Sequence, residues 1–304
     1  MIDVEKLTLA DKPVLVIAGA TATGKSALAL SAARQGRGVI INADSMQIYD
    51  AIPLLTAQPS ALERQQAPHR LYGEVPPREA FSAARWAKLA KAEINAAWRH
   101  EQLPIVVGGT GLYLRTLIDG ISPIPVIDPA VRAKVRLLSV QDDGGQLHAQ
   151  VQRVDPKAAA RLEPGDTQRL SRALEVFWSS GKTLSDWQSQ PLTGGLRSAK
   201  DVTLGLFVLE RDRAELYARC DERLITMMDA GALDELEALM ALDLPHESPI
   251  MRAVAAPPLA AYLAGKCTKA EAVELAQRDT RRFAKRQLTW MRQQFGSWKR
   301  VFMT

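Results

Sequence analysis

A glycine-rich loop near the N-terminus constrains the fold more than any other stretch of this sequence. Residues 19–26 read GATATGKS, which has the spacing G-x-x-x-x-G-K-[ST] of a loop that cradles phosphate. The loop follows a short apolar run, residues 14–18, and precedes residues 25–34, which are rich in helix formers. A strand, a glycine loop and a helix in this order predict an α/β fold built on a parallel sheet.

The chemistry of this loop indicates an anionic ligand. Gly19 and Gly24 allow backbone N–H groups to converge on one point, and the helix N-terminus adds its dipole. Lys25 supplies a point charge, and the Ser26 hydroxyl is suited to Mg²⁺. We therefore expect the loop to bind phosphate, with Mg²⁺ as cofactor. The alternative is a chance glycine-rich turn.

An acidic residue closes the second expected strand, residues 39–44. Asp44 stands where nucleotide hydrolases hold Mg²⁺ and where a general base can act on a bound substrate. A third interpretation is that Asp44 only caps the turn that follows at Ser45.

Glycines and a threonine follow the third expected strand, which begins at residue 104. Gly108, Gly109 and Gly111 allow close approach of the backbone, and Thr110 offers a hydroxyl, although a tight turn alone would explain the glycines. Strands of a doubly wound sheet end along one edge, where ligands bind. Polar motifs after three strands therefore predict a joint site.

The fourth expected strand, residues 202–210, leads into a helix with two arginines on one face. Arg219 and Arg223 are four residues apart, so they can reach back together to a diphosphate. They can equally pair with Glu215 or Glu222 on the surface.

A largely helical segment without evident strands separates the third and fourth strands. We expect a core domain formed by residues 1–122 and 201–304, and a helical insertion domain at residues 123–200. Within the insertion, a helix that begins at Asp166 or Thr167 carries Arg169 and Arg172, which can meet phosphate or water.

The C-terminal stretch, residues 277–300, holds eight Lys and Arg residues against one acid. Positions 278, 282, 285, 289 and 292 follow the helical period and form a basic stripe. Such a run is usually a solvated helix face. The alternative is a polynucleotide partner that contacts Arg278 and Arg282.

The composition is that of an ordinary globular protein, with 304 residues, 47% hydrophobic, and a net charge of +5. Two cysteines are too few for a disulfide framework or a cysteine-based zinc site. The sequence shows no run of membrane-span length and no apolar core of a signal peptide near its start. We expect a cytoplasmic monomer with no membrane association.

Together these motifs resemble those of the bacterial tRNA dimethylallyltransferases. The resemblance covers most of the chain and rests on GATATGKS at 19–26, DSMQIY at 44–49, VGGTGLYLR at 107–115, DPKAAARLEPGDTQRLSRALEVF at 155–177, RAELYARCDERLITMMDAGALDE at 213–235 and RRFAKRQLTWMR at 281–292. It implies a P-loop NTPase-like parallel sheet flanked by helices, with a mainly helical insertion domain that contacts tRNA. It also implies transfer of a dimethylallyl group from dimethylallyl diphosphate to the exocyclic amine of the adenosine immediately 3′ of the tRNA anticodon.

The resemblance implies roles for particular residues as well. Asp44 is the base that deprotonates the amine, Lys25 neutralises the leaving diphosphate with Mg²⁺ near Ser26, and Thr110 assists at the diphosphate or the base. The expected diphosphate ligands are Gly19, Ala20, Thr21, Ala22, Thr23, Gly24, Lys25, Ser26 and Arg223. The expected tRNA contacts are Asp44, Ser45, Met46, Gln47, Thr110, Gln168, Arg169, Leu170, Ser171 and Arg172, with Arg278 and Arg282 added from the basic stripe.

The chain departs from the family pattern in three places. Ala20 replaces a proline, residues 50–59 read DAIPLLTAQP in place of RGMDIGTAKP, and residues 252–259 read RAVAAPPL with Ala255 at a glycine position. Other functions also fit a phosphate loop: a small-molecule kinase that uses ATP, a nucleic-acid-binding ATPase, and a prenyltransferase that acts on free AMP or ATP.

Overall fold

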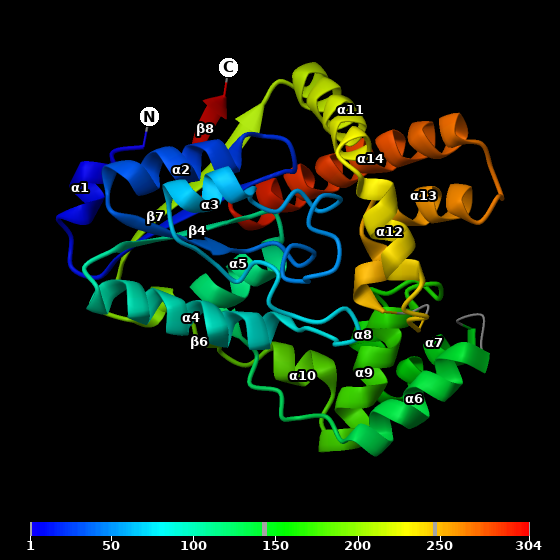
Figure 1. The fold of residues 1–304 in the computed structure, drawn as a ribbon. Helices are drawn as coiled ribbons and strands as arrows, with labels where there is room; N and C mark the ends of the chain where they lie inside the picture. The colour runs from blue at the N-terminus through cyan, green and yellow to red at the C-terminus, as the bar shows by residue number, and fades with distance from the viewer. Residues whose placement is uncertain (1, 142–144, 246–247, 304) are drawn as a thin grey trace. The chain divides into compact units, whose positions relative to one another are not determined.

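The structure is a computed structural model that describes residues 2–141, 145–245 and 248–303. The chain divides into two compact units (Figure 1). Residues 1–118 and 196–304 form one, which we call the sheet unit, and Asp119–Gly195 form the other, the helical unit. These boundaries fall a few residues before the expected ones at 122/123 and 200/201.

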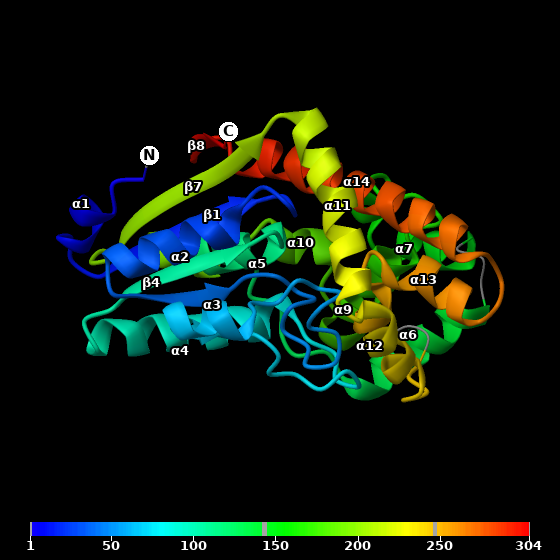
Figure 2. The same cartoon turned by 45° about the horizontal axis from the view of Figure 1, so that its top comes forward.

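Six parallel strands form the main sheet, in the order β3-β2-β4-β1-β7-β8. Figure 2 shows β4, β1 and β7 side by side, with β1 in the interior of the sheet. The strands are β1 (Pro13–Gly19), β2 (Gly38–Asn42), β3 (His69–Arg70), β4 (Leu103–Gly108), β7 (Thr203–Arg211) and β8 (Lys299–Met303).

Side chains of β1 alternate between two hydrophobic cores, one on each face of the sheet. Val14 and Val16 belong to one core, and Leu15 and Ile17 belong to the other. A strand that is apolar on both faces must be covered by helices on both faces. This arrangement confirms the predicted α/β fold.

Helices of the sheet unit supply the covering layers. Helix α2 (Lys25–Gln35) packs into one core, whereas α4 (Ala83–Arg99), α5 (Gly111–Ile118) and α14 (Lys269–Gln294) contribute to the other. The remaining helices of this unit are α1 (Val4–Thr8), α3 (Ala61–Gln66), α11 (Arg213–Asp229), α12 (Ala232–Met240) and α13 (Ala256–Leu263), with 3₁₀ turns at Leu196–Ser198 and Pro249–Arg252.

The helical unit has a core of its own. It contains α6 (Pro129–Gln141), α7 (Gly145–Val154), α8 (Pro156–Ala159), α9 (Thr167–Ser180) and α10 (Leu184–Gln188). The Asp166 side chain caps α9 by accepting the Arg169 N–H, and Gly181 ends it at a φ of 68°. Contrary to the expected absence of strands, β5 (Gly120–Ile121) and β6 (Thr193–Gly194) pair antiparallel in this unit.

The strands that end in polar motifs agree with the sequence prediction within one or two residues. Strands β3 and β8 were not predicted. Strand β8 follows β7 in the chain and pairs with it at the edge of the sheet, so β7 is neither the last strand nor an edge strand.

Candidate active site

The phosphate loop lies between β1 and α2, as its sequence pattern predicts. Gly24 adopts a φ of 98° and stands at the N-cap of α2, a conformation that favours glycine. The loop is closed on itself, because Lys25 Nζ and Thr23 Oγ1 donate to the carbonyl oxygen of Ala20 at 2.7 and 2.8 Å. Thr23 is fully buried, so its hydroxyl supports the loop from within.

Lys25 carries a charge that burial disfavours. Burial lowers its pKa from 10.5 to about 8, and Arg223 acts in the same direction, whereas the Asp44 carboxylate opposes the shift. An anion placed beside the ammonium group would restore the electrostatic balance. The loop therefore presents a cation prepared for a phosphate group.

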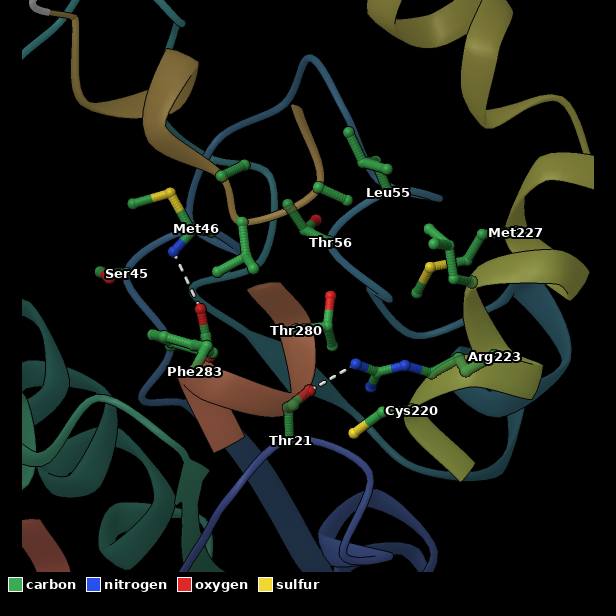
Figure 3. A pocket seen from close by; sticks show the side chains of 15 residues that line it. Thr21, Ser45, Met46, Leu55, Thr56, Cys220, Arg223, Met227, Thr280 and Phe283 are labelled. Atoms are coloured by element: carbon green, nitrogen blue, oxygen red, sulfur yellow. Dashed lines mark hydrogen bonds between the residues drawn. The ribbon is translucent and has the colours of Figure 1, made fainter. Parts of the chain in front are cut away.

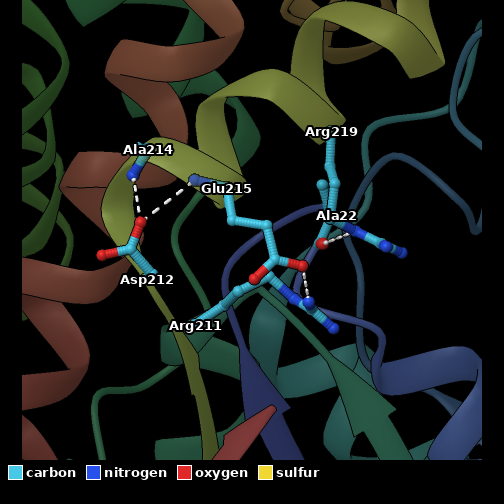
Figure 4. A network of polar contacts seen from close by, with 6 residues as sticks. All are labelled: Ala22, Arg211, Asp212, Ala214, Glu215 and Arg219. Carbon is cyan, nitrogen blue, oxygen red and sulfur yellow. Dashed lines mark hydrogen bonds and ion pairs between the residues drawn. The ribbon is translucent and has the colours of Figure 1, made fainter. Parts of the chain in front are cut away.

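Helix α11 places two further cations at the loop. Arg223 Nη2 donates to Thr21 Oγ1, and Arg219 Nε donates to the Ala22 carbonyl oxygen at 3.1 Å (Figures 3 and 4). The i, i+4 spacing thus turns both side chains toward the loop, as one of the two sequence interpretations predicts. Burial lowers the pKa of Arg223, which also leaves its charge open to compensation by an anion.

Arg211 is a cation at the same loop that sequence reasoning missed. It ends β7 with its side chain only 5% exposed, and it pairs with Glu215 (Figure 4). A Cβ placed on Gly24 would lie 3.8 Å from Arg211 Nη2, so the guanidinium borders the loop. Within the part of the chain that the structure describes, its buried Nε has no hydrogen-bond partner. The sequence feature that could have identified Arg211 was its position directly after the strand expected at residues 202–210.

Asp44 lies at the carboxyl end of β2 in a turn made rigid by hydrogen bonds. Its N–H donates to Asn42 Oδ1 at 2.7 Å, and its Oδ1 accepts the Met46 N–H at 2.9 Å. Asn42 is fully buried and donates to the carbonyl oxygens of Asp44 and Leu71. The carboxylate is therefore held in place while Asp44 remains partly exposed.

The turn after β4 holds the Asp44 turn from the other side. A Cβ on Gly108 would lie 2.1 Å from the Ala43 carbonyl oxygen, so only glycine permits this approach. Thr110 donates its N–H to the same oxygen at 3.1 Å, and its Oγ1 accepts the Ser45 N–H at 2.9 Å. Thr110 thus fixes the residue next to Asp44.

One pocket unites these elements within the sheet unit (Figure 3). Its volume is about 90 Å³, and its polar lining includes Thr21, Asp44 and Arg223. An apolar wall faces them, formed by Met46, Leu55, Leu224, Met227, Ala253, Val254, Ala255 and Phe283. The arrangement suits a ligand with an anionic end and a small apolar end.

The unusual Ala255 fits this wall without strain. It has φ −85° and ψ −12°, a right-handed conformation open to any residue, and it stands at the N-cap of α13. The replaced glycine is therefore not required by the backbone at this position.

Four of the twelve expected tRNA contacts are exposed, and all but one of the others are partly exposed. Arg278 and Arg282 lie on α14 with side chains 45% and 63% exposed, and Arg282 borders a groove with Lys285 and Trp290. In the helical unit, Gln168 and Arg169 are exposed on α9, whereas Ser171 and Arg172 are partly exposed.

Leu170 corrects one expectation. Its side chain is fully buried in the core of the helical unit, together with Leu174. It holds α9 in place and its side chain does not reach the surface where RNA could bind.

Comparison with known proteins identifies the family of this chain. The family model for IPP transferase matches residues 47–294. The tRNA dimethylallyltransferase of Azorhizobium caulinodans is 49% identical over 95% of this chain and 92% of its own length. That of Sphingopyxis alaskensis is 49% identical over 94% and 92%. This chain belongs to the IPP transferase family.

Solved structures of relatives have the same fold. The tRNA isopentenylpyrophosphate transferase of Bacillus halodurans aligns with a TM-score of 0.68 at 30% identity, covering 96% of this chain and 90% of that one. A eukaryotic dimethylallyltransferase acting on tRNA aligns with a TM-score of 0.79 at 27% identity, covering 95% and 73%. Membership of this family confirms the resemblance and favours a prenyl transferase over the kinase alternative.

Residues 2–141, 145–245 and 248–303 contain no evident membrane span and no evident cluster of metal ligands. No helix there is both long and apolar enough to span a bilayer. No cluster of three or more His, Cys, Asp or Glu side chains that could hold a metal occurs in the same ranges.

Proposed function

We propose that this protein transfers the dimethylallyl group of dimethylallyl diphosphate to the exocyclic amine of the adenosine immediately 3′ of the anticodon in tRNA. The observation that carries the proposal is the single pocket in which Asp44, Arg223 and an apolar wall meet beside the phosphate loop. Family membership supports this class of reaction, since the relatives from Azorhizobium caulinodans and Sphingopyxis alaskensis are named tRNA dimethylallyltransferases.

The loop and its arginines would bind the diphosphate. Lys25 and Arg223 are half-buried cations whose pKa values are lowered by desolvation, so a diphosphate at this place would stabilise their charged forms. As the carbon–oxygen bond to the diphosphate breaks, negative charge grows on the leaving oxygen, and these preorganised cations stabilise it. We assign leaving-group stabilisation to Lys25.

Mg²⁺ fits the donors present at the loop. The Ser26 hydroxyl is exposed in the first turn of α2, and Mg²⁺ is commonly held by one or two protein oxygens together with phosphate and water. Such an ion neutralises charge on the leaving group when it is bound.

Asp44 would act as the base on the adenine amine. The nitrogen forms a bond to the dimethylallyl carbon, the bond from that carbon to the diphosphate breaks, and the amine proton passes to the Asp44 carboxylate. The hydrogen bonds of Asp44 to Asn42 and Met46 fix the carboxylate for this transfer. Thr110 would act through Ser45, which it holds beside the base.

Binding of tRNA would use the basic surfaces on both units. We propose Arg278 and Arg282 on α14, and Gln168, Arg169 and Arg172 on α9, as contacts to the RNA backbone. The target adenosine must leave its stack to reach the pocket, which Ser45 and Met46 line beside Asp44. We propose Gln47, the next residue in the chain, as a further tRNA contact. We expect the protein to act as a monomer in the cytoplasm.

Asp44→Asn tests the assignment of the base. We expect the single-turnover rate with saturating tRNA to fall by roughly a hundred- to ten-thousandfold, with Mg²⁺–diphosphate binding nearly unchanged. A metal ligand at this position would behave differently, because excess Mg²⁺ would then partly restore the rate. Restoration by Mg²⁺ would therefore refute Asp44 as the base.

A further inference from the structure

A buried glutamine on α14 connects two halves of the candidate site. Gln287 is 8% exposed, and its side-chain amide lies between the phosphate loop and the turn after β4. Its Oε1 accepts the Thr21 N–H at 2.9 Å, and its Nε2 donates to the Gly109 carbonyl oxygen at 2.9 Å. These partners are far from Gln287 in sequence, so the amide joins three separate segments.

The chemistry of the two partners specifies an amide in one orientation. A backbone N–H needs an acceptor and a carbonyl oxygen needs a donor, and a single amide supplies both. A carboxylate could accept from Thr21 but could not donate to Gly109, and an apolar side chain would leave both groups without a partner.

The same face of α14 fits closely against the turn after β4. A Cβ on Gly109 would lie 2.3 Å from Gln287 Nε2, and one on Gly111 would lie 2.0 Å from the Trp290 ring. Gly111 therefore leaves room for the Trp290 ring, and Gly109 leaves room for the Gln287 amide. Ala284, one turn earlier, packs with Ala20 of the phosphate loop.

The two hydrogen bonds of the Gln287 amide, which we call the bridge, connect the diphosphate side of the site to the base. Thr21 accepts a hydrogen bond from Arg223, at the diphosphate side. Gly109 precedes Thr110, which holds Ala43 and Ser45 on either side of Asp44. The relative position of the leaving group and the base thus depends on contacts that pass through one amide.

We propose that Gln287 is a positioning residue that sets the separation between the diphosphate-binding loop and Asp44. The inference rests on the transfer reaction proposed above. Group transfer requires the acceptor nitrogen about 3–3.5 Å from the reacting carbon, and a misplacement of about 1 Å can cost about a hundredfold in rate. Loss of the bridge should therefore lower the chemical step more than substrate binding.

Gln287→Met is the direct test, because it keeps the length of the side chain and removes both hydrogen bonds. Gln277→Met is the matched control: Gln277 is half-buried on the same helix and donates to the Asp221 carbonyl oxygen at 3.4 Å, away from the loops. We expect the single-turnover rate of Gln287→Met to fall about ten- to hundredfold, with KM for both substrates within about threefold of wild type. Gln277→Met should keep the wild-type rate.

A double-mutant cycle provides a second test that does not depend on the stability of one variant. Gly109→Ala forces the amide aside from the other end and should also lower the single-turnover rate. In a Gln287→Ala background the conflict with the amide is gone and only a 3.3 Å approach to the Gly19 carbonyl oxygen remains, so Gly109→Ala should add little further loss. Thermal unfolding of each variant ensures that rates are compared between folded proteins.

The outcomes separate this inference from the proposed function. Equal rates for Gln287→Met and Gln277→Met, or independent additive losses in the cycle, would overturn the role of Gln287 while the wild type still prenylates tRNA. If the wild type forms no prenylated tRNA from dimethylallyl diphosphate, the proposed function fails, and the role of Gln287 in it fails with it.

Discussion

Replacement of Lys25 by methionine should stabilise the fold while it abolishes turnover. Methionine keeps the length and apolar character of the lysine stem but removes the ammonium group. In the folded protein that group has a pKa of about 8, against 10.5 for an ordinary lysine, mainly because of burial. The site therefore holds a charge that the free protein would be more stable without.

The magnitude follows from the two pKa values. At pH 7 the lysine is protonated in both the folded and the unfolded chain, so the full cost of about 3 kcal/mol is present in the folded state. The hydrogen bond from Lys25 Nζ to the Ala20 carbonyl oxygen returns about 1 kcal/mol. Lys25→Met should thus raise the free energy of unfolding by about 2 kcal/mol at pH 7.

The sign of the pH dependence is specific. The pKa of Lys25 is lower in the folded protein than in the unfolded chain, so the unfolded chain binds more protons between about pH 8 and 10.5. The contribution of Lys25 to the wild-type free energy of unfolding therefore becomes less unfavourable as pH rises across this window. Near pH 10 the cost of the Lys25 charge in the folded protein is only about 1 kcal/mol, which is close to the stabilisation that the hydrogen bond to Ala20 provides. The two proteins should then be equally stable.

Urea unfolding of wild type and Lys25→Met at pH 7 and pH 10 measures both effects. Lys285→Met, at an exposed position on α14, is the control and should leave stability nearly unchanged at either pH. A Lys25→Met variant that is less stable than wild type at pH 7, or a difference that does not change with pH, would refute the reasoning.

Two further predictions concern the ligands. The value of kcat/KM for dimethylallyl diphosphate should fall about tenfold per pH unit above pH 8, because Lys25 of the free enzyme loses its proton there; a flat profile to pH 9.5 would contradict this. Replacement of Arg278 and Arg282 by alanine should reduce the slope of log Kd for tRNA against log salt concentration by about 1.4–1.8, as measured by filter binding. An unchanged slope would show that these two arginines face solvent and do not contact tRNA phosphates.

The elements that carry the site could be predicted because their signals are local. Residues 14–26 contain a buried strand, a glycine loop and a helix start in sequence, and each part constrains its neighbours. The proximity of Asp44 and Thr110 could be predicted from the sequence because parallel strands end along one edge of a sheet. The structure places them in adjacent turns joined through Ser45.

The rest depends on contacts that sequence patterns do not contain. Gln287 reads as one polar position in a basic helix until its partners 266 and 178 residues away are known. Arg211 becomes a loop residue only through its closeness to Gly24. Strand β8 is five residues long with two cations, and it exists because β7 offers a free edge beside it.

The most direct test of the central claim is mass analysis of tRNA after incubation with this protein, dimethylallyl diphosphate and Mg²⁺. We predict that the adenosine immediately 3′ of the anticodon gains one dimethylallyl group in place of one hydrogen, and that Asp44→Asn yields a trace of this product at most. Unmodified tRNA after incubation with folded wild-type protein, or modification of free AMP in its place, would contradict the proposed function.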